Sequence, residues 1–123
     1  MTKKKTAIFG ATTNENRYAF LAAERLTKSG HDIVPLGIRQ GEVFGERILD
    51  IRQKPDLSDV DTVTLYLGPQ NQTEYYDYLL QIKPNRVIFN PGTENQELIS
   101  LLKQNNIEPV EACTLVMLTT NSY

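Results

Sequence analysis

Short apolar segments alternate with segments of helical periodicity along the sequence, and this alternation is the feature that most constrains its fold. Residues 6–9 form an apolar run that Gly10 ends, and in residues 17–28 alanine and leucine recur at positions i, i+3, i+4 and i+7. A helical pattern also follows the strand-like residues 62–67 and 86–89. Strands that alternate with helices are joined as parallel neighbours by right-handed crossovers. The sequence therefore predicts the α/β class, as a Rossmann-like open parallel sheet of about five strands with helices on both faces.

Glycine, proline and the two hydrophobic periods set the expected boundaries of the elements. The predicted strands are residues 6–9, 32–36, 62–67, 86–89 and 108–110, and the predicted helices include residues 17–28, 75–82 and 98–102. The sequence between residues 37 and 61 is irregular, and the segment from Cys113 onward fits neither period clearly.

Three local patterns add finer expectations. Pro35 cannot donate to a β-ladder, so the strand that contains it should lie near an edge of the sheet or end there. Gly45-Glu46, flanked by the apolar pairs 43–44 and 48–49, suits the centre of a type II′ hairpin turn. Thr93, with Gln96 three residues later, fits a capping box that begins the last long helix.

The composition is that of one globular domain covering residues 1–123. Hydrophobic residues make up 40% of the chain and charged residues 23%, and the net charge is −2, which does not favour nucleic acid as a partner. No apolar run approaches the roughly 18 residues that span a bilayer, and no signal-peptide pattern follows the first lysines. The single cysteine, Cys113, excludes an internal disulfide. We expect a cytoplasmic protein that binds neither nucleic acid nor membrane.

The loops that follow the strands are where the sequence predicts a ligand. In open parallel sheets, ligands bind beyond the carboxyl ends of the strands, where the strand order reverses. In the first such loop, Gly10 allows close backbone approach, Thr12 and Thr13 offer hydroxyls, and Arg17 stands at a helix amino terminus. These features are typical of phosphate binding. The loop lacks the remaining glycines of a dinucleotide fingerprint and the lysine of a Walker loop, so ATP hydrolysis is not expected.

The end of the second strand bears on which nucleotide is bound. An NAD site usually places an acidic residue there, and this sequence has Arg39 with no acid before Glu42. A basic residue suits a phosphorylated ribose, as in NADP or coenzyme A, although an exposed arginine without a ligand is equally compatible with the pattern.

The remaining chemistry-bearing residues do not assemble into a catalytic constellation. The only histidine, His31, begins the second strand and so lies at the end of the sheet away from the predicted site. Without further His or Cys partners a zinc site is not expected. Cys113 follows the fifth strand and can reach the site, where it is either a structural or a reactive thiol. We predict no metal and no catalytic residues, and a protein that is not an enzyme on its own.

Six short motifs, taken in order, resemble the small stand-alone coenzyme A-binding domain proteins of bacteria. The family's fold is that of the amino-terminal coenzyme A-binding domain of the succinyl-CoA synthetase α subunit, and the similarity covers about residues 6–118. The motifs are residues 7–18, 34–37, 42–45, 68–69, 90–95 and 111–113. The chain departs from the family where Thr12 replaces serine, Asn16 replaces proline, and Gly37-Ile38 replaces an asparagine-proline pair.

The resemblance implies that four loops line a coenzyme A cleft and that Cys113 lies near the cofactor. With Arg17 and Arg39 added, the predicted cofactor-binding residues are Gly10, Ala11, Thr12, Thr13, Arg17, Leu36, Gly37, Arg39, Gly68, Pro69, Asn90, Pro91, Gly92, Thr93 and Cys113.

The predicted function is binding of coenzyme A or an acyl-CoA, which would report acyl-CoA status to an unidentified protein partner, with a homodimer as the expected assembly. Three alternatives remain: an NADP-binding oxidoreductase, a subunit of an acyl-CoA-handling enzyme, and an interaction module that has lost its ligand.

Overall fold

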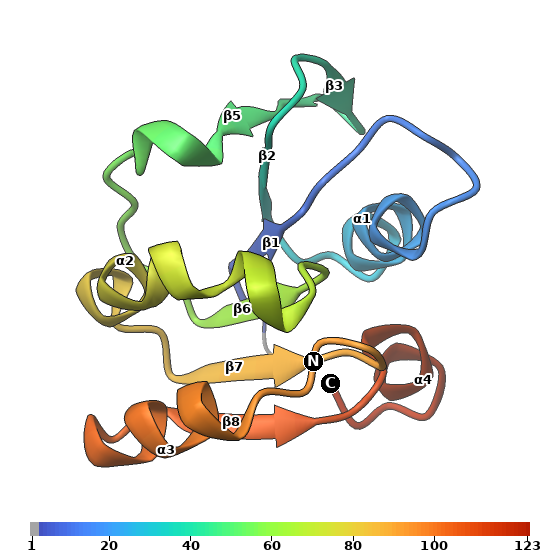
Figure 1. Ribbon diagram of the computed structural model, residues 1–123. Coiled ribbons are helices and arrows are strands. Elements are labelled where there is room, and N and C mark those ends of the chain that lie inside the picture. The colour runs from blue at the N-terminus through green and yellow to red at the C-terminus, as the bar shows by residue number, and fades with distance from the viewer. Residues whose placement is uncertain (1–2) are drawn as a thin grey trace.

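One six-stranded parallel sheet organises the chain, in the order β5-β2-β1-β6-β7-β8. The structure is a computed structural model that describes residues 3–123. The chain runs outward from β1 through β2 to β5, returns to place β6 on the other side of β1, and continues to β7 and β8 (Figure 1). The strand order therefore reverses between β1 and β6. The strands are β1 (Thr6–Phe9), β2 (Ile33–Gly37), β5 (Leu49–Asp50), β6 (Thr62–Leu65), β7 (Arg86–Phe89) and β8 (Glu108–Glu111).

Helices cover both faces of this sheet. α1 and α4 lie together on one face, and α2 and α3 pack against the other (Figure 1). Three short 3-10 turns join the elements. The helices are α1 (Tyr18–Lys28), α2 (Tyr76–Ile82), α3 (Gln96–Gln104) and α4 (Thr114–Thr119), and the turns are η1 (Ile51–Gln53), η2 (Pro69–Asn71) and η3 (Thr73–Tyr75).

The core is divided by the sheet into two apolar clusters. All four residues of β1 are buried, and they alternate between the faces: Ala7 and Phe9 belong to the cluster under α2 and α3, while Ile8 belongs to the cluster under α1. Burial on both faces explains why the central strands read as continuous apolar runs. The α/β class, the parallel sheet and helices on both faces are confirmed.

The sheet has a sixth strand, β5, that the sequence analysis did not predict. β5 pairs with β2 only through Leu36–Leu49 and Gly37–Asp50. Two paired residues are too few to produce a periodic signal in the sequence. β2 is consequently second from the edge of the sheet. Its ladder with β5 begins at Leu36, one residue after Pro35. The missing N–H of Pro35 therefore costs this ladder no hydrogen bond.

The expected hairpin is present, but its turn lies one residue earlier than predicted. β3 (Glu42–Val43) and β4 (Glu46–Arg47) are antiparallel, with Val43 opposite Glu46, so Phe44 and Gly45 are the central residues. Both have positive φ, 49° and 86°, as in a type I′ turn. The Phe44 ring packs against the Phe20 ring of α1, with 5.1 Å between the ring centroids.

The predicted cap of the last long helix is wrong, and the unassigned tail is a helix. Asn95, not Thr93, caps α3: its Oδ1 accepts a hydrogen bond from the Leu98 N–H at 3.2 Å. The Thr93 hydroxyl is buried and donates to the Asn90 carbonyl at 2.8 Å. The segment after Cys113 forms α4, which packs beside α1.

Candidate functional site

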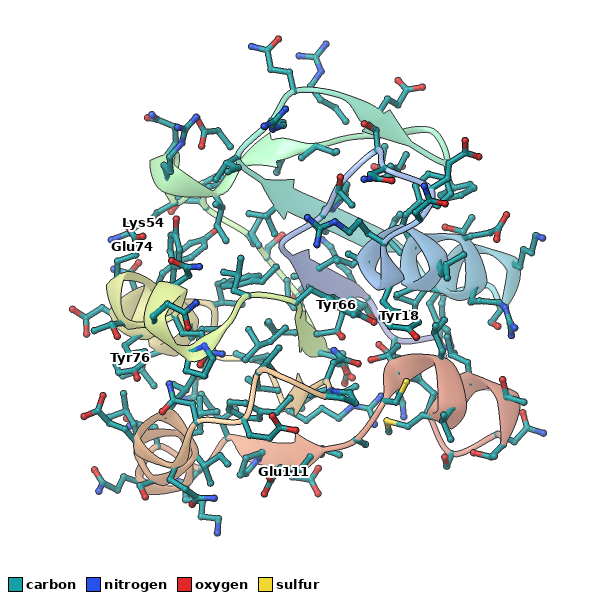
Figure 2. The ribbon with its side chains drawn as sticks, turned by 45° about the vertical axis from the view of Figure 1, so that its right-hand side comes forward. Tyr18, Lys54, Tyr66, Glu74, Tyr76 and Glu111 are labelled. Atoms are coloured by element: carbon teal, nitrogen blue, oxygen red, sulfur yellow. The ribbon has the colours of Figure 1, made fainter. Side chains whose placement is uncertain are left out.

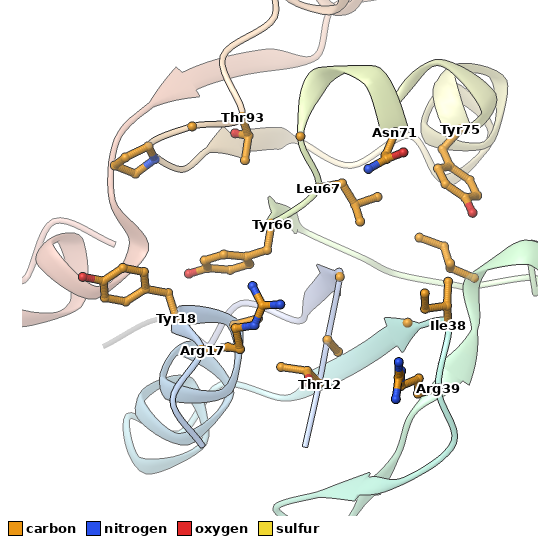
Figure 3. Close-up of a pocket in the computed structure, with 18 of the residues that line it drawn as sticks. Thr12, Arg17, Tyr18, Ile38, Arg39, Tyr66, Leu67, Asn71, Tyr75 and Thr93 are labelled. Carbon is orange, nitrogen blue, oxygen red and sulfur yellow. The ribbon is translucent and has the colours of Figure 1, made fainter. Parts of the chain in front are cut away.

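A cavity of about 720 Å³ lies beyond the carboxyl ends of β1, β2, β6 and β7, where the strand order reverses (Figure 3). Its wall comes from the loops after these four strands, from the start of α1 and from the 3-10 turns. The lining residues are Gly10, Ala11, Thr12, Asn16, Arg17, Tyr18, Ala19, Gly37, Ile38, Arg39, Ile51, Tyr66, Leu67, Gly68, Asn71, Glu74, Tyr75, Pro91, Gly92 and Thr93.

Two glycines allow the first loop to fold closely over the ends of the neighbouring strands. The Gly10 and Ala11 N–H groups both donate to the Leu36 carbonyl at 2.9 Å, which turns the chain across β2. Gly10 has a φ of 98°, a conformation that favours glycine. A Cβ on Gly37 would lie 2.4 Å from the Ala11 carbonyl oxygen, so only glycine fits there without movement of the loop.

The amino terminus of α1 faces the cavity without a side chain that caps it. Arg17 occupies the N-cap position, and its side chain makes no capping hydrogen bond. Arg17 and Arg39 lie on either side of Thr12 along one side of the cavity (Figure 3). The free N–H groups of the first helical turn and two guanidinium groups favour negative charge there. Glu74 is the acidic residue among the lining side chains.

The two ends of the cavity carry apolar side chains. Ile38 and Tyr75 mark one end, near Arg39, and Tyr18 and Tyr66 lie close together at the other end (Figures 2 and 3). Burial raises the pKa of Tyr66 to about 12. Tyr18 is 70% exposed at the cavity mouth. The cavity thus combines two arginines along one side with apolar side chains at both ends.

Ten of the fifteen predicted cofactor-binding residues line this cavity: Gly10, Ala11, Thr12, Arg17, Gly37, Arg39, Gly68, Pro91, Gly92 and Thr93. Their role in binding a cofactor stays a prediction.

The other five do not line it, for local reasons. Leu36 is fully buried in the core, and Thr13 lies against Gly41 of the segment that leads into β3. Asn90 is 2% exposed, and its amide is used internally by Thr64, Leu65 and Thr114. Cys113 is the N-cap residue of α4, and Pro69 begins η2. Neither of these two is among the lining residues.

The structure adds ten lining residues that the sequence analysis did not name: Asn16, Tyr18, Ala19, Ile38, Ile51, Tyr66, Leu67, Asn71, Glu74 and Tyr75. Several are next to predicted residues in the sequence and could have been found by extending each strand end by one position. Ile51 and Tyr75 carried no such signal, because they belong to 3-10 turns that only the tertiary structure brings to the cavity.

The opposite end of the sheet holds His31, as predicted. His31 is 4% exposed, and its Nδ1 accepts a hydrogen bond from the Lys4 N–H at 2.9 Å. Within residues 3–123, no group of three or more His, Cys, Asp or Glu side chains is placed to hold a metal ion. In the same part of the chain, no helix has the length and apolar character needed to cross a membrane.

Solved structures show how widely this fold occurs. The protein in one crystal structure, described as an uncharacterized protein, is 54% identical in sequence, with a TM-score of 0.96 and full coverage of both chains. A protein from Thermus thermophilus is 21% identical (TM-score 0.83, covering 98% of this chain and 91% of its own). A hypothetical protein from Pyrococcus horikoshii OT3 is 24% identical (TM-score 0.81, covering 93% and 80%). The last two matches show the fold alone.

The family comparison supplies the chemical context. A search of curated proteins finds no match. The family model described as "CoA binding domain" matches residues 4–119, nearly the whole chain, and this agrees with the resemblance seen in the sequence. The chain therefore belongs to the CoA-binding domain family.

Proposed function

We propose that this protein binds coenzyme A or an acyl-CoA in the cavity at the carboxyl ends of the strands. The observation that carries the proposal is the order of groups along the cavity: Arg17 beside the uncapped α1 terminus, Thr12, and Arg39 farther along the same side. Coenzyme A also carries two separated anionic groups, a pyrophosphate and a ribose 3′-phosphate. Membership of the CoA-binding domain family supports this assignment.

In the proposed complex, the pyrophosphate lies at residues 10–12 and the amino terminus of α1, where N–H groups and Arg17 would neutralise it. The phosphorylated ribose lies near Arg39, with the base against the apolar end that includes Ile38. The pantetheine arm then follows Leu67-Gly68 and residues 91–93 toward Tyr18.

The proposed role is retention of the cofactor, not its chemical conversion. Among residues 3–123, the side chains that line the cavity include no histidine, cysteine or lysine, the groups most often used as bases and nucleophiles in acyl chemistry. Occupancy of the site would then report acyl-CoA status to a protein partner in the cytoplasm. A second subunit that supplies catalytic groups is the alternative within the same ligand class.

NADP is the second candidate ligand, and Arg39 is the observation that favours it. An arginine at the end of β2 also suits the 2′-phosphate of NADP. A site that has lost its ligand is the third candidate. These readings differ in which ligands stabilise the protein, so one series of measurements separates them.

The test is a thermal-shift series with coenzyme A, acetyl-CoA, dephospho-CoA, NADP, NAD and ATP. A ligand at about one hundred times its Kd adds about 2.7 kcal/mol to the free energy of unfolding, which raises Tm on the order of 10 °C for a chain of this size. We expect coenzyme A and acetyl-CoA to give such shifts, and NAD and ATP to give none. A shift with NADP alone would favour the reductase, and no shift with any ligand would favour the interaction module.

The variant Arg39→Gln tests how coenzyme A is oriented in the cavity. It should weaken coenzyme A binding about tenfold, because one charge-assisted contact is lost, and leave binding of dephospho-CoA nearly unchanged. Equal weakening of both ligands would place the 3′-phosphate elsewhere.

A further inference from the structure

The side chain of Gln72 joins the two loops that form one side of the cavity. Gln72 is 1% exposed and lies between η2 and η3. Its Nε2 donates hydrogen bonds to the Leu67 carbonyl and to the Thr93 carbonyl, both at 2.8 Å. Leu67 follows β6 and Thr93 follows β7, and both residues line the cavity. One buried amide therefore holds together the ends of two different loops.

The Gln72 amide is a direct hydrogen-bonded link between these two loops. In the chain from residue 3 to residue 123, no other hydrogen bond connects residues 66–72 to residues 91–94. The Gln72 backbone is itself fixed, because its N–H donates to the Pro69 carbonyl at 3.1 Å and its carbonyl accepts from the Tyr75 N–H at 2.9 Å. A side chain anchored in this way transmits the position of one loop to the other.

The remaining polar atom of Gln72 is also satisfied, which fixes the orientation of the amide. Its Oε1 accepts from Asn95 Nδ2 at 2.9 Å, and Asn95 Nδ2 also donates to the Tyr76 hydroxyl at 2.8 Å. The hydroxyl of Tyr76, the first residue of α2 (Figure 2), in turn donates to Glu97 of α3 at 3.0 Å. With its carbonyl oxygen held by Asn95, the Gln72 amide directs both N–H groups at the loops.

We propose that Gln72 is a positioning residue that sets the spacing between the Leu67-Gly68 loop and residues 91–93. This spacing favours ligands that contact both loops over ligands that reach only one. The inference rests on the proposed function, in which the pantetheine arm of coenzyme A runs between these loops. Gln72 does not line the cavity and acts through the two carbonyl groups that it holds.

The experiment compares coenzyme A with adenosine 3′,5′-bisphosphate, which lacks the phosphopantetheine arm, by isothermal titration calorimetry. The variant Gln72→Met keeps the length of the side chain and removes both donors. We expect coenzyme A affinity to fall about tenfold and bisphosphate affinity to change less than about twofold. The second variant, Gln72→Glu, has a single O–H donor when it is protonated at this buried position, so it can donate to only one of the two carbonyls. It should show the same selective loss of coenzyme A affinity. The inference therefore stays testable if the Gln72→Met chain does not fold.

Tyr76→Phe is the matched control, because it removes a hydroxyl from the same network without touching either loop carbonyl. It should leave the ratio of the two affinities unchanged even if it lowers Tm. Equal weakening of both ligands by the Gln72 variants, or no weakening of coenzyme A, would overturn the positioning role. If wild-type protein binds the bisphosphate but not coenzyme A, or binds neither, the proposed function itself fails.

Discussion

At the scale of single residues, the shape of the cavity depends on glycine, because a close backbone contact takes the space that a side chain would need. Gly37 ends β2 and lies under the first loop, where its α-carbon approaches the Ala11 backbone more closely than any other residue type allows. This packing places residues 10–12 directly over the strand end, so that their backbone can reach a ligand. Gly37 therefore contributes to the shape of the cavity and provides no functional group to a ligand.

We predict that Gly37→Ala lowers both stability and coenzyme A affinity. The new Cβ would lie 2.4 Å from the Ala11 carbonyl oxygen, so the first loop must move away from β2. The free energy of unfolding should fall by about 1–3 kcal/mol, as for other overpacked sites. Urea denaturation and calorimetric titration measure the two effects.

Gly68→Ala is the control for the stability part of this prediction, because its Cβ would meet only the flexible end of the Gln70 side chain, at 3.0 Å. Its effect on stability should stay within about 0.5 kcal/mol. A Gly37→Ala protein as stable as wild type would show that the loop does not need this close contact.

At the scale of elements, Asn90 holds strands and a helix together next to residues 91–93, which line the cavity. Its Nδ2 donates to the Thr64 hydroxyl at 2.7 Å and to the Leu65 carbonyl at 2.9 Å, and its Oδ1 accepts from the Thr114 N–H at 2.9 Å. The end of β7 is thereby joined to β6 and to the start of α4. Asn90 is predicted from the sequence to contact the cofactor, but in the structure its side-chain amide is hydrogen-bonded within the protein.

Replacing Asn90 by leucine should therefore destabilise the fold strongly. The substitution leaves the Leu65 carbonyl and the Thr114 N–H without this partner, and buried unpaired groups of this kind cost about 1–3 kcal/mol each. We expect a loss of about 2–4 kcal/mol in urea denaturation. Asn105→Ala, which removes an exposed hydrogen bond from the side-chain amide to the Leu101 carbonyl, should change the free energy of unfolding by less than about 0.5 kcal/mol. A loss below about 1 kcal/mol for Asn90→Leu would contradict this role.

The strands of four or five residues and the helices α1, α2 and α3 could be predicted from the sequence, because burial on one or both faces imposes a period. β5 could not, since its two paired residues leave no pattern. The residues of the candidate site also divide into those that the sequence predicts and those that it does not. Residues next to a strand end were accessible to prediction, whereas Ile51 and Tyr75 reach the cavity only through tertiary structure. Asn90 shows the remaining difficulty: a polar residue after a strand has the same sequence signature whether its amide faces a ligand or an unpredicted helix.

At the scale of the whole molecule, the two ends of the sheet have different roles. The carboxyl ends of the strands open into the cavity, while residues 121–123 pack over the amino ends. There the Tyr123 ring lies 4.9 Å from the His31 ring and 4.4 Å from the Arg86 guanidinium. His31 is thus buried beside the positive charges of Lys4 and Arg86, with Asp61 as the opposing charge.

This arrangement predicts that stability falls as the pH drops below about 6.5, the ordinary pKa of histidine. Burial first, and then the charges of Lys4 and Arg86, lower the pKa of His31 in the folded protein. As the pH falls through 6.5, the unfolded chain takes up a proton that the folded chain does not, so the free energy of unfolding decreases by up to about 1.4 kcal/mol per pH unit. The decrease ends once the pH is below the folded pKa. The lowered pKa of Asp61 reduces stability only as the pH approaches and falls below about 3.8, the ordinary pKa of this group, and so does not overlap with the start of this window.

Urea denaturation at pH 7, 6 and 5 measures the effect, and His31→Asn isolates it. Asparagine keeps an acceptor for the Lys4 N–H and does not titrate, so the stability of the variant should change little over this range. Because His31 lies at the opposite end of the sheet from the cavity, coenzyme A affinity at pH 7 should be the same in both proteins. Equal pH dependence in the two proteins would assign the acid sensitivity to other groups, and weakened ligand binding in the variant would show that the two ends of the sheet are coupled.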